Sequence, residues 1–172
     1  SYGYDEALRL GAERIGWSSR APAGSSPGVR KRGIGVGTQG IWVSGCMGFP
    51  DIYEHTGAII KLNRDGSADI SSGTVDIGSG QIATLCQIAA AELGVGMDKV
   101  RMVYADTDTV PFDAPTHASR GTYSSGLAVK AAAAQVRKRV FEIAAGLMEA
   151  NPDDLDISNG QVYVKGSPDS AR

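Results

Sequence analysis

The segment at residues 78–83 places glycine, hydroxyl and amide groups immediately before a predicted helix. It reads GSGQIA, so Gly78, Gly80 and Ala83 match the pattern G-x-G-x-x-G/A. A glycine-rich turn that opens a helix presents backbone N–H groups that have no helical carbonyl partner, and such groups bind anions. The segment is therefore a candidate cofactor-binding or phosphate-binding loop.

A second candidate loop lies between Asp106 and Tyr123, where the chain reads DTDTVPFDAPTHASRGTY. It gathers threonine, serine, aspartate and arginine residues and ends where another helix is expected. The backbone amides of Ser119 to Thr122, with nearby hydroxyls and the Arg120 guanidinium, would form a second anion cradle. Two cradles at the starts of neighbouring helices suit an extended, phosphate-bearing cofactor better than a single phosphate.

The first loop also fits a dinucleotide-binding site, in which Asp106 would bind the ribose. Against this, the preceding strand is half polar, whereas a parallel strand buried on both faces is almost continuously apolar. An earlier match at Gly35, Gly37 and Gly40 leads into an extended segment and not into a helix, so it lacks this mechanism. Three alternatives stay open at this point: an NAD(P)-binding dehydrogenase domain, a non-catalytic module for a phosphorylated ligand, and a structural interaction module.

The elements that must position these loops follow from the hydrophobic pattern. An amphipathic helix is expected at residues 1–17, from a preceding region, and a Ser-, Pro- and Gly-rich linker at 18–32. Residues 33–172 are then expected to form the main domain, which holds both candidate cofactor-binding loops. Its predicted strands are 40–45, 57–63, 67–77 and 99–106, its helices are 82–93 and the segment from about 123 to 151, and its last element is a hairpin that turns at Asn159-Gly160.

These elements predict an α+β fold with two layers, in which a mixed β-sheet carries two main helices on one face, plus the N-terminal helix and the C-terminal hairpin. Gly94 stands where the first main helix should end. On the longer helix we expect the apolar side chains to point inward; these are Val129, Val136, Val140, Ile143 and Leu147.

Composition excludes several classes of function. The formal net charge of −2 and the pI near 5.6 give no electrostatic basis for binding nucleic acid or an anionic membrane. No apolar run approaches the roughly 20 residues of a membrane span, and the N-terminus is not a signal peptide, so a cytoplasmic location is expected. His55 and His117 lack the spacing of metal ligands, and no metal site is predicted.

The two loops together carry a family resemblance. The stretches GTVDIGSGQIATLCQIAAAELGV and DTDTVPFDAPTHASRGTYSSGLAVKAAA resemble the molybdenum-binding (large) subunit of the xanthine oxidase/dehydrogenase family of molybdenum hydroxylases. Aldehyde oxidoreductase and 4-hydroxybenzoyl-CoA reductase are relatives. The stretches YDEALRLGAERIGW and KRGIGVG resemble the entry to that family's second molybdopterin-binding domain, so the chain is similar to that domain only.

The resemblance implies that the first loop holds the pterin side of a molybdopterin cofactor and that the second binds its phosphates. The cytosine dinucleotide form is one possible form of the cofactor. The residues implied are Gly78, Ser79, Gly80 and Gln81 in the first loop and Ala118, Ser119, Arg120, Gly121 and Thr122 in the second. Ser79 stands where the family often has glutamine, and Gln81 follows two positions later.

The resemblance also implies an oxidoreductase that hydroxylates a heteroaromatic or aldehyde carbon. Its partners would be the remaining domains of the large subunit and iron–sulfur and FAD-containing subunits or domains. The family's catalytic glutamate has no counterpart here, because no glutamate follows Glu149 and its context on a helix does not match. We therefore expect this chain alone to lack both the cofactor and activity.

Overall fold

The computed structural model describes residues 3–37, 55–114 and 116–167, with Asp169 and Ala171. The chain divides into two units, Ser1–Gly40 and Ile41–Arg172. The strand predicted at 40–45 lies outside the described residues. The predicted domain limits stay predictions.

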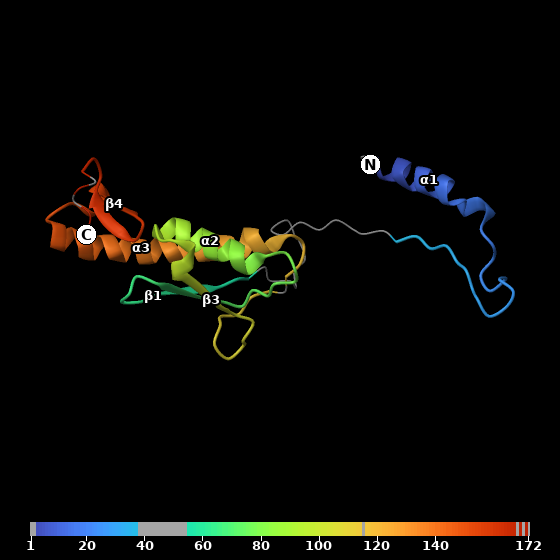
Figure 1. Ribbon diagram of the computed structural model, residues 1–172, viewed down its shortest axis with the longest axis horizontal. Helices are drawn as coiled ribbons and strands as arrows, with labels where there is room; N and C mark the ends of the chain where they lie inside the picture. The colour runs from blue at the N-terminus through green and yellow to red at the C-terminus, as the bar shows by residue number, and fades with distance from the viewer. Residues whose placement is uncertain (1–2, 38–54, 115, 168, 170, 172) are drawn as a thin grey trace. The chain divides into compact units, whose positions relative to one another are not determined.

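The first unit contains helix α1 (Tyr4–Ile15), which is drawn in blue in Figure 1, followed by a 3-10 turn at Trp17–Ser19. The helix ends at Gly16, whose φ of 69° turns its N–H back onto carbonyls of the last helical turn. None of the helix's side chains is buried. The predicted N-terminal helix is confirmed.

The second unit is built on a three-stranded sheet in the order β1–β2–β3 (Figure 1). Strands β1 (Ala58–Leu62) and β2 (Ala68–Ser72) form an antiparallel hairpin, and β3 (Val100–Tyr104) runs parallel to β2. Ile70 lies at the centre of this sheet, in register with Ile60 on one side and Met102 on the other. The sheet is therefore mixed, as predicted.

Strand β2 is half polar because only one face of the sheet is covered by helices. Ala68, Ile70 and Ser72 are buried, whereas Asp69 and Ser71 between them are partly exposed. This alternation is the period-2 pattern of a strand with one face on a core and one face open.

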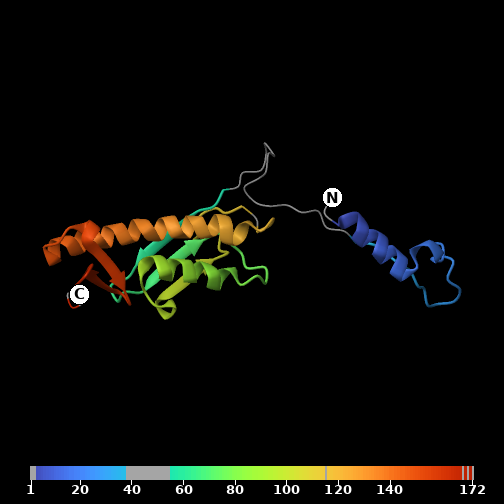
Figure 2. The ribbon, with the colours of Figure 1, turned by 90° about the horizontal axis from the view of Figure 1, so that it is seen from above.

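Helix α2 (Gln81–Leu93) connects β2 to β3, and helix α3 (Gly126–Met148) follows β3. Both helices lie on the same face of the sheet, side by side (Figures 1 and 2). They enclose the main hydrophobic core, which consists of Ile70, Leu85, Cys86, Ala89, Ala90, Val100 and Val129. The predicted two-layer α+β arrangement is confirmed.

A π-helical turn, η3 (Gly121–Ser125), directly precedes helix α3. A π turn holds one residue more per hydrogen-bonded ring than an α turn, and such turns are frequent at functional sites. Both ends of this turn, Gly121 and Ser125, are buried.

The inward face predicted for α3 is wrong at its C-terminal end. Val129 is fully buried, but Ile143 and Leu147 are 56% and 82% exposed. The 23 residues of α3 extend over about 34 Å, whereas a five-residue strand spans about 17 Å. The helix therefore runs past the sheet, and its last turns present a different face, including Ala145, to the C-terminal hairpin.

That hairpin consists of β4 (Leu155–Ser158) and β5 (Gln161–Val164), joined at Asn159-Gly160 as predicted. Its turn is tied to the end of α2, because the N–H of Gly160 donates to the carbonyl of Gly94 at 2.8 Å. Among the described residues, no helix is long and apolar enough to cross a membrane.

Candidate functional site

The first predicted loop is occupied by an aspartate of its own chain. The Asp76 carboxylate accepts hydrogen bonds from the N–H groups of Gly78 (2.8 Å) and Gly80 (3.2 Å). Both glycines have positive φ, 100° and 72°, which only glycine adopts easily. The expectation that the amides around Gly80 are unpaired donors is therefore wrong: Asp76 already supplies the negative charge that the start of α2 favours.

These hydrogen bonds make Asp76 sensitive to pH. The backbone N–H of Gly78, followed by those of neighbouring loop residues, holds the pKa of Asp76 below its ordinary value. A carboxyl whose folded pKa is lowered stabilises the fold above its unfolded pKa, and this contribution is lost as pH falls through the folded pKa.

We therefore expect Asp76→Asn to lower the free energy of unfolding at about pH 7 and to have a smaller effect at about pH 3, because the wild-type carboxyl is then largely protonated in the unfolded chain. Urea unfolding followed by circular dichroism at both pH values would measure this. An equal loss at the two pH values would contradict the assignment.

The second predicted loop contains two consecutive residues in the left-handed region. Ala118 and Ser119 have φ of 47° and 59°, although neither is glycine. Such conformations cost energy and persist where surrounding contacts enforce them. The turn closes where the N–H of Arg120 donates to the carbonyl of His117 at 2.9 Å, and η3 follows directly.

The two loops meet at Gln81 and Gly121, the first residues of α2 and η3. A Cβ atom on Gly121 would lie 1.2 Å from Nε2 of Gln81, so only glycine fits there while Gln81 keeps this position. Gln81 is 7% exposed, and its Oε1 is buried with no hydrogen-bond partner among the described residues. The two loops thus lie side by side at neighbouring helix starts, as predicted.

The nine predicted residues divide by exposure. The exposed ones, which line the surface of the two loops, are Gly78, Ser79, Gly80, Ser119 and Thr122. The buried ones are Gln81, Arg120 and Gly121, and Ala118 is partly exposed.

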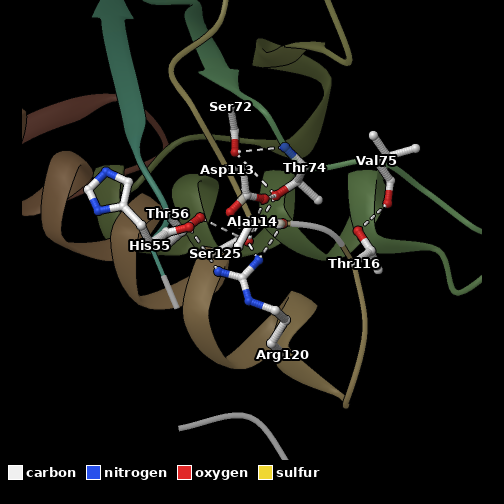
Figure 3. A network of polar contacts seen from close by, with 10 residues as sticks. All are labelled: His55, Thr56, Ser72, Thr74, Val75, Asp113, Ala114, Thr116, Arg120 and Ser125. Carbon is white, nitrogen blue, oxygen red and sulfur yellow. Dashed lines mark hydrogen bonds and ion pairs between the residues drawn. The ribbon is translucent and has the colours of Figure 1, made fainter. Parts of the chain in front are cut away.

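The guanidinium of Arg120 points into the protein (Figure 3) and is only 1% exposed. Its Nη1 pairs with Oδ1 of Asp113 at 3.0 Å and donates to the carbonyl of Ala114 at 2.8 Å. Its Nη2 donates to the carbonyl of His55 at 3.1 Å. The group assigned to phosphate from the sequence is thus bound to internal partners.

Hydroxyl groups complete this polar network (Figure 3). Thr74 Oγ1 donates to Oδ2 of Asp113 at 2.8 Å and lies 2.8 Å from Oγ of Ser125, within η3. Ser125 is also 3.3 Å from Thr56 Oγ1, and Ser72 donates to Thr74 at 3.2 Å. The network therefore joins the start of β1, the end of β2 and the start of α3.

The sequence interpretation missed these network residues. One signal was available, because Ser72 and Thr74 continue the alternation that buries Ala68 and Ile70, so they had to be polar groups on the core side. No sequence pattern pointed to Asp113, which pairs with Arg120 in its own loop and with Thr74 after β2.

Other candidate residues have local roles. Asp106 accepts a hydrogen bond from the N–H of Asp108 at 3.0 Å, in the turn after β3. The ring of His55 stacks on Phe112, with centroids 5.9 Å apart. Cys86 is a buried core residue, and burial raises the pKa of its thiol. In the described part of the chain, no three His, Cys, Asp or Glu side chains gather as a potential metal site.

The described unit is an α+β fold in which two polar loops meet at neighbouring helix starts. Comparison with known proteins identifies the family of this fold. Residues 10–172 match the model of a family described as the molybdopterin cofactor-binding domain. The chain therefore belongs to this family, which confirms the resemblance to the molybdenum hydroxylases and disfavours the nicotinamide alternative.

Comparison with individual proteins gives the same family. The xanthine dehydrogenase molybdenum-binding subunit of Escherichia coli O157:H7 is 29% identical over 98% of this chain, and the alignment covers 22% of that subunit. The carbon monoxide dehydrogenase large chain of Hydrogenophaga pseudoflava is 36% identical over 62% of this chain and 13% of that relative. Quinoline 2-oxidoreductase from Pseudomonas putida 86 superimposes with a TM-score of 0.66 at 31% identity, covering 69% of this chain and 15% of that one.

Proposed function

We propose that this chain forms one wall of the molybdopterin site in the large subunit of a molybdenum hydroxylase. The observation that carries the proposal is the contact between Gln81 and Gly121, which brings the two loops together at the starts of α2 and α3. When bound, the molybdenum cofactor supplies the redox chemistry that transfers oxygen from water to a heteroaromatic or aldehyde carbon.

The residues present fit such a cofactor. The buried Oε1 of Gln81 is an acceptor without a partner among the described residues, and it suits an N–H donor of a pterin ring. The first loop carries the Asp76 carboxylate, which disfavours a phosphate there. The phosphates are therefore assigned to the second loop, where Ser119 and Thr122 offer exposed hydroxyl groups.

Apolar side chains exposed beside the loops favour a covering partner. Val75, Ile77, Phe112 and Tyr123 are 45%, 68%, 67% and 61% exposed. We infer that the remaining domains of the large subunit cover this surface and close the cofactor cleft, since apolar side chains gathered beside a binding site are typical of interfaces. Iron–sulfur and FAD-containing partners and a cytoplasmic location belong to the same proposal.

The test uses the intact large subunit, with molybdenum and pterin measured per polypeptide. We expect Gly121→Ala to lower the cofactor content strongly, because the new methyl group displaces Gln81 from between the loops. Its effect on the free energy of unfolding should stay within about 1 kcal/mol, since the end of a flexible side chain can move aside. Gln81→Ala should also lower the cofactor content.

Gly146→Ala is the matched control, because Gly146 lies in α3 and a Cβ there would meet nothing within 4 Å. It should retain the cofactor. Full cofactor content in both Gly121→Ala and Gln81→Ala would refute the proposed site.

A further inference from the structure

The ion pair between Asp113 and Arg120 is the most deeply buried charged pair in the described part of the chain, with side chains 2% and 1% exposed. Burying two charges costs desolvation energy that their attraction does not always repay. The pair is fully hydrogen-bonded, through Ala114, His55 and Thr74, which keeps that cost down. Such an arrangement fixes geometry more than it adds stability.

The geometry that the pair fixes is that of the second loop. Before the loop's turn, the Asp113 backbone bridges to Thr56, and the N–H of Ala114 donates to the carbonyl of His55 at 2.9 Å. Next, Thr116 Oγ1 donates to the carbonyl of Val75 at 2.9 Å (Figure 3). After the turn, the Arg120 side chain reaches back to Asp113. The loop is thus held on both sides of residues 117–119, through contacts with the segment before β1 and the segment after β2.

The strained residues lie between these anchors. Ala118 and Ser119 have positive φ. Arg120, whose buried side chain is held by Asp113, follows them directly in the chain. A turn of two left-handed non-glycine residues relaxes unless its ends are held. The exposed Ser119 and Thr122 keep their positions only if the 117–119 turn keeps its conformation.

We propose that Arg120 and Asp113 are positioning residues that hold the 117–119 turn ready for the cofactor, and that the Arg120 guanidinium is not a phosphate ligand. This inference rests on the proposed function, because it assumes that residues 118–122 contact the cofactor. It assigns the phosphate contacts to backbone N–H groups and hydroxyls of the loop instead of to the guanidinium.

The two possible roles of Arg120 predict opposite effects of Asp113→Asn. If Arg120 positions the loop, loss of the Asp113 charge loosens the turn and cofactor content in the intact large subunit falls about tenfold, the size typical for loss of a group that orients a ligand-binding residue. If Arg120 bound phosphate directly, the same change would release the guanidinium and leave cofactor content unchanged or higher.

Arg120→Lys gives a second discrimination. It keeps the positive charge but lacks the planar fork that contacts Asp113, Ala114 and His55 together. We expect it to lose cofactor as Asp113→Asn does, and we expect amides 117–122 to exchange hydrogen faster in both variants. Retention of cofactor in Arg120→Lys, or unchanged exchange, would overturn the inference.

Arg137→Met controls for general loss of stability. It breaks a 2.6 Å ion pair with Asp156 near the C-terminal hairpin, away from the loops, and should keep its cofactor. If Gly121→Ala loses cofactor and Asp113→Asn does not, the positioning role of Arg120 and Asp113 is overturned, and the proposed function stands. Retention in both would overturn the proposed function with it.

Discussion

Arg120→Met should lower the free energy of unfolding by about 3–5 kcal/mol, the range found when one member of a buried ion pair is removed. The reason is that the Asp113 carboxylate, 2% exposed, loses its compensating charge while it stays buried. Denaturant unfolding of the full chain, followed by circular dichroism, measures the loss.

An exposed ion pair provides the comparison. Arg101 pairs with Asp69 at 2.8 Å, but its side chain is 73% exposed, and Arg101→Met should cost less than about 1 kcal/mol. The double variant Asp113→Leu with Arg120→Met should recover part of the loss, because two apolar side chains leave no buried charge. If Arg120→Met and Arg101→Met lowered the free energy of unfolding by similar amounts, the buried pair would contribute no more to stability than the exposed pair.

The second large effect is expected at Gly73, where β2 leads into the first loop. A Cβ atom there would lie 2.6 Å from the carbonyl oxygen of Pro111 and 3.0 Å from the backbone N of Asp113. Backbone atoms cannot rotate aside as a side chain can, so Gly73→Ala must push the two segments apart. We expect a loss of about 1–3 kcal/mol in the free energy of unfolding, the usual cost of overpacking.

Gly146→Ala again gives the baseline, because alanine in an open helical position stabilises by about 0.5–1 kcal/mol. Calorimetric or denaturant unfolding of the two variants should therefore differ in sign. If Gly73→Ala were as stable as the parent chain, the close approach of these segments would be disproved.

Much of the fold could be predicted from local signals. The turn at Asn159-Gly160 and the helix end at Gly94 depend on residues that tolerate left-handed backbone, and such signals are local. The positions of the two loops followed from the same logic, since a glycine or polar cluster before an amphipathic segment indicates a helix start.

What could not be predicted depends on three-dimensional contacts that the hydrophobic pattern does not encode. The sequence shows an arginine beside hydroxyl groups, but it does not show that Asp113 captures this arginine inside the protein. Likewise, the length of α3 relative to the sheet decides that Ile143 and Leu147 face solvent, although their spacing continues the apolar stripe. The Asp76 carboxylate lies just before its loop, yet a charged residue there was not distinguishable from an ordinary surface aspartate.

The π turn η3 also has a consequence for how this part of the chain tolerates insertions and deletions during evolution. Relative to a plain α-helix, a π turn contains one inserted residue, and each residue of an α-helix turns the chain by about 100°. Gly121 meets Gln81 at one end of the turn and Ser125 joins the Thr74 network at the other. A deletion of one residue between them would keep α3 helical but rotate one end away from its partner, so the length of this five-residue segment is constrained even where its side chains are exposed.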